Sequence, residues 1–133
     1  MPDDPHAPEL LDAVARWLRD ELPGQLAPGS GAAFHARVAA HAVETVAREI
    51  RDGAAADGAA AQRLRELLGR AGGDGADAAA LEAELVARLR DGRQRTDDPA
   101  LIDHLWQTTL AKLAIDQPGY APYRRELARR GDS

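Results

Sequence analysis

The amino-acid sequence predicts an all-α protein, a single-domain helical bundle of five main helices and a short C-terminal helix. Alanine and leucine dominate its apolar residues, and both favour helices. Apolar residues recur at spacings of three and four, which places them on one face of a helix, and no segment alternates with period two as a half-buried strand would. Proline, glycine and aspartate stand where these periodic segments begin and end.

The 133 residues suit one domain, which we expect over residues 8–130 after a flexible tail of residues 1–7. The first helix is expected over residues 8–22, because proline is tolerated in a first turn and Pro23-Gly24 stops a helix. Its apolar residues share one side, which should face the core: Leu10, Leu11, Val14, Trp17, Leu18 and Leu22.

The second helix, over residues 32–51, has the longest uninterrupted helical pattern and should end at Asp52-Gly53. It should bury one apolar line: Phe34, Val38, Ala42, Val46 and Ile50. After a low-complexity segment, a shorter third helix is expected over residues 59–68, with Gly69 as its stop. Its inward residues should be Leu64, Leu67 and Leu68.

A flexible turn is expected at residues 72–75, and a fourth helix over residues 78–90. Asp77 can cap its start and Gly92 marks its end. The residues of this helix expected to face the core are Leu81, Leu85, Val86 and Leu89.

The fifth helix should begin at Asp98-Pro99, an aspartate cap followed by proline at the first helical position. It should end where residues 118–119 place a proline and a glycine, and a short last helix follows over residues 120–130. The residues expected to face inward from these two helices are Leu101, Ile102, Leu105, Trp106, Thr109, Leu110, Leu113, Ala114, Tyr123 and Leu127.

The composition of the chain excludes several classes of function. The net charge of −5 and the isoelectric point near 5.3 argue against a general nucleic-acid binder. The absence of cysteine excludes disulfides, thiol catalysis and cysteine metal sites. No apolar run approaches the ~20 residues of a membrane span, and no signal peptide is recognisable, so we expect a cytoplasmic protein without a membrane partner.

The apolar residues are mostly small, and alanine adds almost no side-chain volume. Such a chain forms helices easily but packs them around a thin core. Self-association into a homo-oligomer or binding to a partner would complete that core. A modest monomer with close-packed helices is the alternative.

No catalytic set is recognisable. His35 and His41 stand six residues apart on one helix, which separates them by about 120° and prevents them from sharing a metal ion. The only serines, Ser30 and Ser133, lie outside any nucleophile elbow. We therefore expect no metal, no cofactor and no enzymatic activity of this chain by itself.

Two polar clusters are less ordinary. The first recurs at i, i+4, i+7 and i+11 of the second helix: Arg37, His41, Glu44 and Arg48. It is either a solvated ladder of surface charge or a docking face or small-anion site. The second holds Lys112, Asp116, Tyr120, Tyr123 and Arg124. It either fastens the last helix to the bundle or contacts a partner.

Three segments resemble a bacterial family of small helical domains of unknown function: Leu10-Leu-Asp-Ala-Val14, Phe34-His35-Ala-Arg37-Val38-Ala39 and Lys112-Leu-Ala-Ile-Asp116-x-Pro118-x-Tyr120-x-x-Tyr123-Arg124. The resemblance spans nearly the whole chain in order, and its middle, near residues 53–80, matches only in helical character. Members of this family are encoded beside an aminoglycoside-phosphotransferase-like kinase and an acyl-CoA dehydrogenase.

The resemblance implies a non-catalytic accessory subunit of that kinase, which phosphorylates a hydroxyacyl-CoA in hydroxy-acid catabolism and would itself hold ATP, Mg²⁺ and the catalytic base. The dehydrogenase-like enzyme of the same pathway is a further candidate partner. The residues expected at a partner or ligand interface are Phe34, His35, Arg37, His41, Lys112, Asp116, Tyr120, Tyr123 and Arg124. Two alternatives stay open: a stand-alone binding module for an acyl-CoA or similar anion, and an architectural homodimer.

Overall fold

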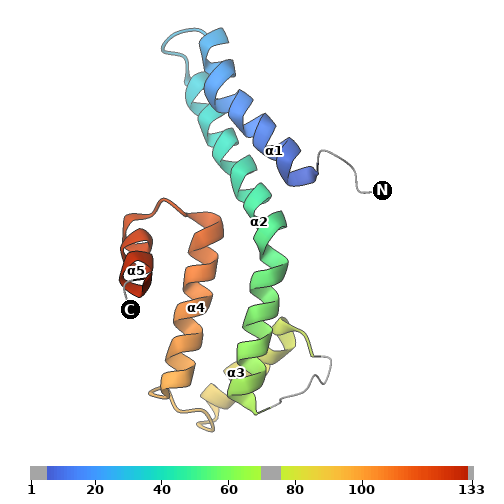
Figure 1. The fold of residues 1–133 in the computed structure, drawn as a ribbon, viewed down its shortest axis with the longest axis vertical. Coiled ribbons are helices and arrows are strands. Elements are labelled where there is room, and N and C mark those ends of the chain that lie inside the picture. Colours follow the sequence, from blue (N-terminus) through green and yellow to red (C-terminus); the bar gives the residue numbers. More distant parts are fainter. Residues whose placement is uncertain (1–5, 70–75, 132–133) are drawn as a thin grey trace. The chain divides into compact units, whose positions relative to one another are not determined.

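A computed structural model describes residues 6–69 and 76–131, and over these residues it contains five α-helices and no strand (Figure 1). The all-α prediction is confirmed. The chain divides into two compact units, Met1–Gly53 and Ala54–Ser133, with the boundary inside the longest helix, α2 (Gly31–Leu68). The turn predicted at residues 72–75 and most of the predicted tail lie outside the described residues.

The first unit begins with α1 (Ala7–Arg16), which carries proline in its first turn as predicted. The backbone N–H of His6 donates to the Glu9 carboxylate at 3.3 Å and so closes the start of this helix. The predicted helix continues beyond α1 as a π-helical turn (Trp17–Glu21) and a 3-10 turn (Leu22–Gln25).

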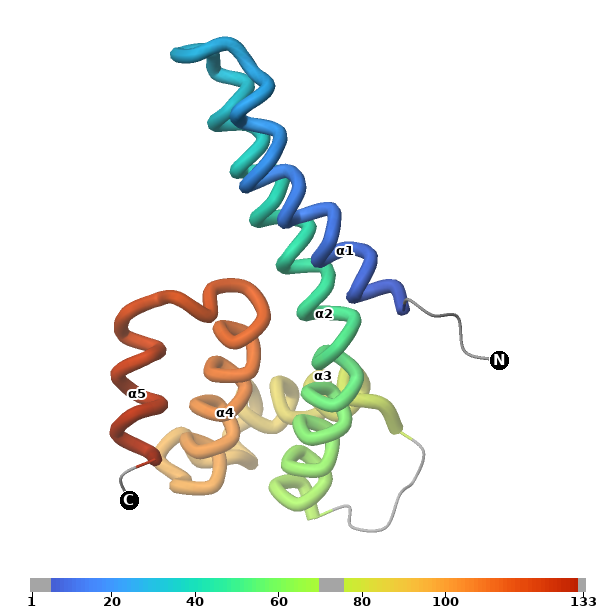
Figure 2. Tube along the Cα trace, turned by 45° about the horizontal axis from the view of Figure 1, so that its top comes forward, coloured from blue at the N-terminus to red at the C-terminus, as the bar shows by residue number. Residues whose placement is uncertain are grey.

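The N-terminal half of α2 lies beside α1 and runs antiparallel to it (Figures 1 and 2). Two ion pairs define this register, because Asp12 pairs with Arg51 while Arg19, further along the chain, pairs with the earlier Glu44. The buried residues among the described part of this unit are all alanine: Ala15, Ala36, Ala40 and Ala47.

The core predicted for this unit is therefore largely wrong, although Leu11, Leu18 and Leu22 are half-buried. The predicted inward line of α2 is exposed: Phe34 60%, Val38 51%, Val46 46% and Ile50 51%, with Ala42 exposed too. On the first helix Leu10, Val14 and Trp17 are exposed by 42–52%. Alanine at the contact lets two helix backbones approach closely, and the larger side chains are left on the flanks.

The predicted stop at Gly53 is also wrong, because α2 continues without a break through the segment that the sequence suggests is a linker. A glycine costs a helix only about 1 kcal/mol relative to alanine. The alanines around Gly53 and Gly58 offset that cost, and the predicted second and third helices become one helix of 38 residues.

The second unit has a conventional leucine core. It joins Leu64 and Leu68 from the end of α2, Leu81 and Leu85 from α3 (Ala78–Arg90), and Leu101 from α4 (Pro99–Asp116). Both predicted caps are confirmed: Asp77 accepts from the N–H of Ala80, and Asp98 accepts from that of Ala100. The inward prediction for Val86 is wrong, since that side chain is 43% exposed.

The last helix, α5 (Ala121–Gly131), lies beside α4 (Figures 1 and 2). It buries Tyr123 as predicted, at 8% exposure, but leaves Leu127 exposed. On α4 the predicted core residues Ile102, Leu105 and Trp106 are 44–51% exposed, because the buried side of this helix follows Leu101 and His104 instead.

Candidate functional site

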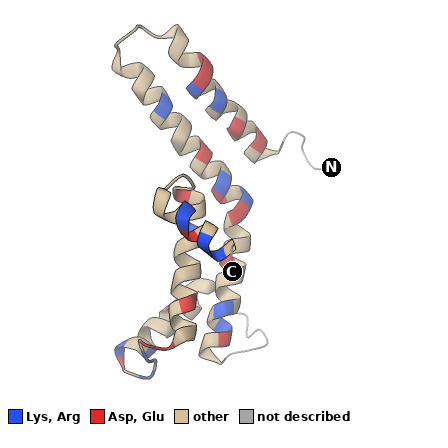
Figure 3. Ribbon diagram, turned by 60° about the vertical axis from the view of Figure 1, so that its left-hand side comes forward, with Lys and Arg blue, Asp and Glu red and all other residues tan. Residues whose placement is uncertain are grey.

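Charged residues occur along both helices of the α1–α2 hairpin (Figure 3), and several of them meet on one side. A pocket of about 330 Å³ lies there, lined by Asp12, Ala15, Arg16, Arg19, Asp20, Glu44, Arg48 and Arg51. Four arginines thus meet three carboxylates, and two of the arginines are paired across the hairpin. Such partly exposed pairs contribute about 0–1 kcal/mol each, and they add to a helix contact whose fully buried residues are all alanine.

The opposite side of the hairpin is apolar. An α-helix turns by about 100° per residue, and two antiparallel helices in the observed register place five half-exposed side chains together on this side. We name this surface the hairpin face: Leu10, Val14, Trp17, Val46 and Ile50. The same geometry puts Asp12, Arg16, Glu44 and Arg48 on the charged side.

A second exposed surface runs along α4. We name it the α4 stripe, and it consists of Ile102, Leu105, Trp106, Thr109, Lys112 and Asp116. All six are exposed and fall within a sector of roughly 120° around the helix axis. The Thr109 hydroxyl donates to the backbone carbonyl of Leu105 at 2.9 Å, so its hydrogen is used within the helix. The stripe is apolar at one end and charged at the other.

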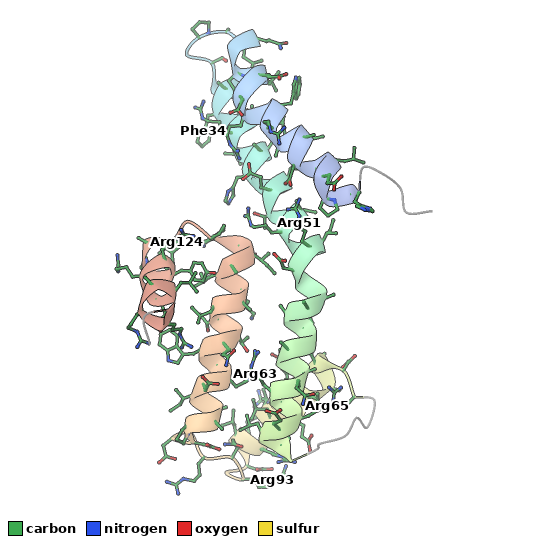
Figure 4. All side chains as sticks on the ribbon, in the orientation of Figure 1. Phe34, Arg51, Arg63, Arg65, Arg93 and Arg124 are labelled. Atoms are coloured by element: carbon green, nitrogen blue, oxygen red, sulfur yellow. The ribbon has the colours of Figure 1, made fainter. Side chains whose placement is uncertain are left out.

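The predicted site residues of the first unit lie exposed on α2. Phe34, Arg37 and His41 share one side of the helix at i, i+3 and i+7, while His35 is turned by about 100° from Phe34. The rings of Phe34 and His35 nevertheless meet edge to face, with centroids 5.8 Å apart. The structure therefore brings three of these four residues together on one side, where Figure 4 shows Phe34 near the start of α2.

The predicted site residues of the second unit have different environments. Lys112 and Asp116 belong to the α4 stripe. The backbone N–H of Arg124 donates to the carbonyl of Tyr120 at 3.0 Å and so starts α5, with both side chains exposed. Tyr123 is buried, which makes it an anchor of α5.

One buried polar cluster links α2 to α4. Nε of Arg63 donates to Nδ1 of His104 at 3.3 Å, and its terminal nitrogen donates to the Thr108 hydroxyl at 3.3 Å. In Figure 4 Arg63 lies on the side of α2 toward α4. Burial of His104, at 3% exposure, lowers the pKa of its imidazole, and the positive charge of Arg63 lowers it further. The imidazole is held neutral, which suits a structural acceptor.

Sequence patterns missed three features of these surfaces: the pairing of Asp12 with Arg51, the exposure of the α4 stripe, and the contact of Arg63 with His104. The spacing of Asp12, Arg16 and Arg19 at i, i+4 and i+7 does indicate a charged side on the first helix. The residues of α2 that pair with this charged side depend on which residues form the contact between the helices. The sequence pattern places the large apolar residues at that contact, where the structure has alanines.

Among the described residues, no group of three histidine, aspartate or glutamate side chains is placed to hold a metal ion. Over the same residues, no helix combines the length and the apolarity that crossing a membrane requires. A second pocket, of about 450 Å³, lies at the loop before α4, where Arg93 and Arg95 pair with Asp91 and Asp97. Neither pocket is lined by Arg37 or Lys112.

A comparison with protein-family models matches residues 26–120 to the domain of unknown function DUF6285. Searches of curated proteins and of solved structures each gave no match. The matched range begins ahead of α2 and ends at Tyr120, and it covers well over half of the chain. The chain therefore belongs to the DUF6285 family.

Proposed function

We propose that this chain is a non-catalytic accessory subunit of an aminoglycoside-phosphotransferase-like kinase that acts on a hydroxyacyl-CoA. The single observation that carries the docking role is the α4 stripe, which exposes Ile102, Leu105 and Trp106 by 44–51%. Three large apolar side chains on one helix face form an exposed apolar patch, and its burial against a partner would be favourable. The kinase as partner follows from the resemblance of the three sequence segments.

The composition of the α4 stripe suits a dissociable interface. Such interfaces have an apolar centre that includes aromatic residues and a polar rim. Trp106 and Leu105 would form the centre, and Lys112 and Asp116 would form the rim. A few centrally placed side chains carry most of the binding energy in interfaces of this kind, and tryptophan is prominent among them.

The test is co-expression with the kinase encoded beside this chain. We expect the two proteins to elute together, and the kinase to phosphorylate its hydroxyacyl-CoA faster in the complex than alone. Separate elution together with equal activity of the isolated kinase would refute the proposal.

Point variants test the surface. Leu105→Glu places a charge in the proposed centre and should weaken the complex at least ten-fold, about 1.4 kcal/mol or more. Val86→Glu makes the same kind of change on α3, where the side chain is exposed by 43% against 51% for Leu105. It should bind as the wild type does. Equal loss in both variants would place the kinase elsewhere.

The alternative of a stand-alone module for an acyl-CoA or a similar anion has less support. Arg37 and Lys112 line neither pocket, and the four arginines of the hairpin pocket face three carboxylates. A rise in melting temperature with acyl-CoA, in the absence of the kinase, would favour it.

A further inference from the structure

We propose that the hairpin face is the interface of a homodimer, in which two α1–α2 hairpins pair about a two-fold axis into a four-helix bundle. This inference is independent of the kinase. It concerns the first unit, and its surface is formed by Leu10, Val14, Trp17, Val46 and Ile50.

The first observation is that the hairpin buries no large side chain of its own. Its buried residues in the described part are four alanines. Burial of apolar area is the main favourable term in folding, at about 25 cal/mol per Å², and alanine offers very little of it. The exposed larger apolar residues of both helices contribute fully only when something covers them.

The second observation is the separation of charge. Around the hairpin face, Asp12, Arg16, Glu44 and Arg48 point to the charged side, and the exposed Glu49 borders the face next to Val46. A two-fold axis sets a surface against its own copy, and an apolar centre pairs with itself without desolvating charge while Glu49 stays at its edge. In the paired arrangement the charged pocket stays on the solvent side, and four-helix bundles are built from such amphipathic layers.

The third observation is the exposed apolar area of the hairpin face. Half-exposed aliphatic side chains offer on the order of 50 Å² each and Trp17 about 100 Å², which gives roughly 300 Å² for the five. A standard interface buries about 800 Å² per partner, of which roughly 500 Å² is apolar. Half-buried Leu11 and Leu18 flank the face and add to its area. The area is below that of a standard interface, so the expected dimer is weak and reversible.

The test is sedimentation equilibrium of the full chain without the kinase, over a wide range of concentrations. The mass should rise with concentration from 14.2 kDa toward twice that value. Val46→Glu should raise the dissociation constant at least ten-fold, whereas Val86→Glu, at 43% against 46% exposure, should leave it unchanged. A mass of one chain throughout, or equal loss in both variants, or a dimer that neither variant weakens, would overturn the proposal.

Circular dichroism shows whether Val46→Glu retains its helices. If it does not, cysteine variants take its place, because the chain has no cysteine of its own. Val46→Cys should be cross-linked into a dimer by a short bis-maleimide, and Val86→Cys should stay largely monomeric. Equal yields from the two variants would overturn the proposal. Kinase binding is measured separately through Leu105, so either proposal can fail while the other stands.

Discussion

Arg63 donates a hydrogen bond to Nδ1 of the buried His104, and this contact joins α2 to α4 within the second unit. The acceptor nitrogen is available only while the imidazole is neutral. Protonation would replace the contact between Arg63 and His104 with a repulsion between two cations. The charged groups that act on the imidazole are Arg63, Glu82 and Asp103, and burial outweighs the attraction of the two carboxylates.

The stability of the second unit should therefore fall in mild acid. The pKa of His104 in the folded chain lies below its ordinary value of 6.5, so the unfolded chain binds the proton more readily. This contribution is fully present above pH 6.5 and is lost as the pH falls through 6.5 toward the folded pKa. Urea denaturation between pH 8 and pH 5 measures it. His104→Gln should flatten the profile, while the exposed His41→Gln should retain the wild-type slope.

Leu64 should be among the most sensitive positions in the chain. It is fully buried in the leucine core of the second unit, so Leu64→Ala should cost about 2–5 kcal/mol of unfolding free energy. Phe34→Ala removes a larger side chain that is 60% exposed, and should change stability by about 0.5 kcal/mol or less. The urea midpoints of the two variants show which substitution costs more stability. The reverse order would show that Phe34, as the sequence suggests, is a core residue.

Alanine should stabilise α2 at Gly58. The glycine lies inside the continuous helix, and a Cβ there meets no atom within 4 Å, so Gly58→Ala should add about 0.5–1 kcal/mol. Gly92 has φ +83°, where an L side chain is strained, so Gly92→Ala should destabilise by about 1 kcal/mol. Thermal unfolding of both variants tests the continuity of α2. No gain at Gly58 would indicate a break in the helix.

The half-buried Glu126 should titrate at an unusually low pH for a carboxyl group. Hydrogen bonds from Arg129 and then Arg130 lower its pKa to about 2. Carbon-detected NMR of the side chain should show this midpoint in the intact chain. In Arg129→Gln the midpoint should move up toward the ordinary value of 4.5. A midpoint near 4.5 in the wild type would mean that the ion pairs do not form in solution.

Local signals in the sequence were enough to predict most of the helix ends. The caps at Asp77 and Asp98 and the stops near Gly92 and Pro118 are properties of short segments, and the structure contains them. The stop at Gly53 fails because a single glycine is a weak signal inside an alanine-rich segment.

Burial was predicted correctly for Tyr123 and for the leucines that form the core of the second unit, such as Leu64 and Leu81. In the hairpin the contact is made by alanines at positions 15, 36, 40 and 47, and a hydrophobic pattern gives more weight to large residues than to small ones. The hairpin face and the apolar part of the α4 stripe consist of large residues that the hydrophobic pattern places in the core and the structure leaves exposed.

The alanine contact between α1 and α2 has a consequence for sequence divergence. A side chain larger than alanine at Ala40 or Ala47, both fully buried, would push the two backbones apart and break the pairing of Asp12 with Arg51. Substitution at these positions should be tolerated only to glycine. The strongest constraints on the hairpin thus fall on its least distinctive residues, so distant relatives could share its structure while offering a sequence search almost nothing to align.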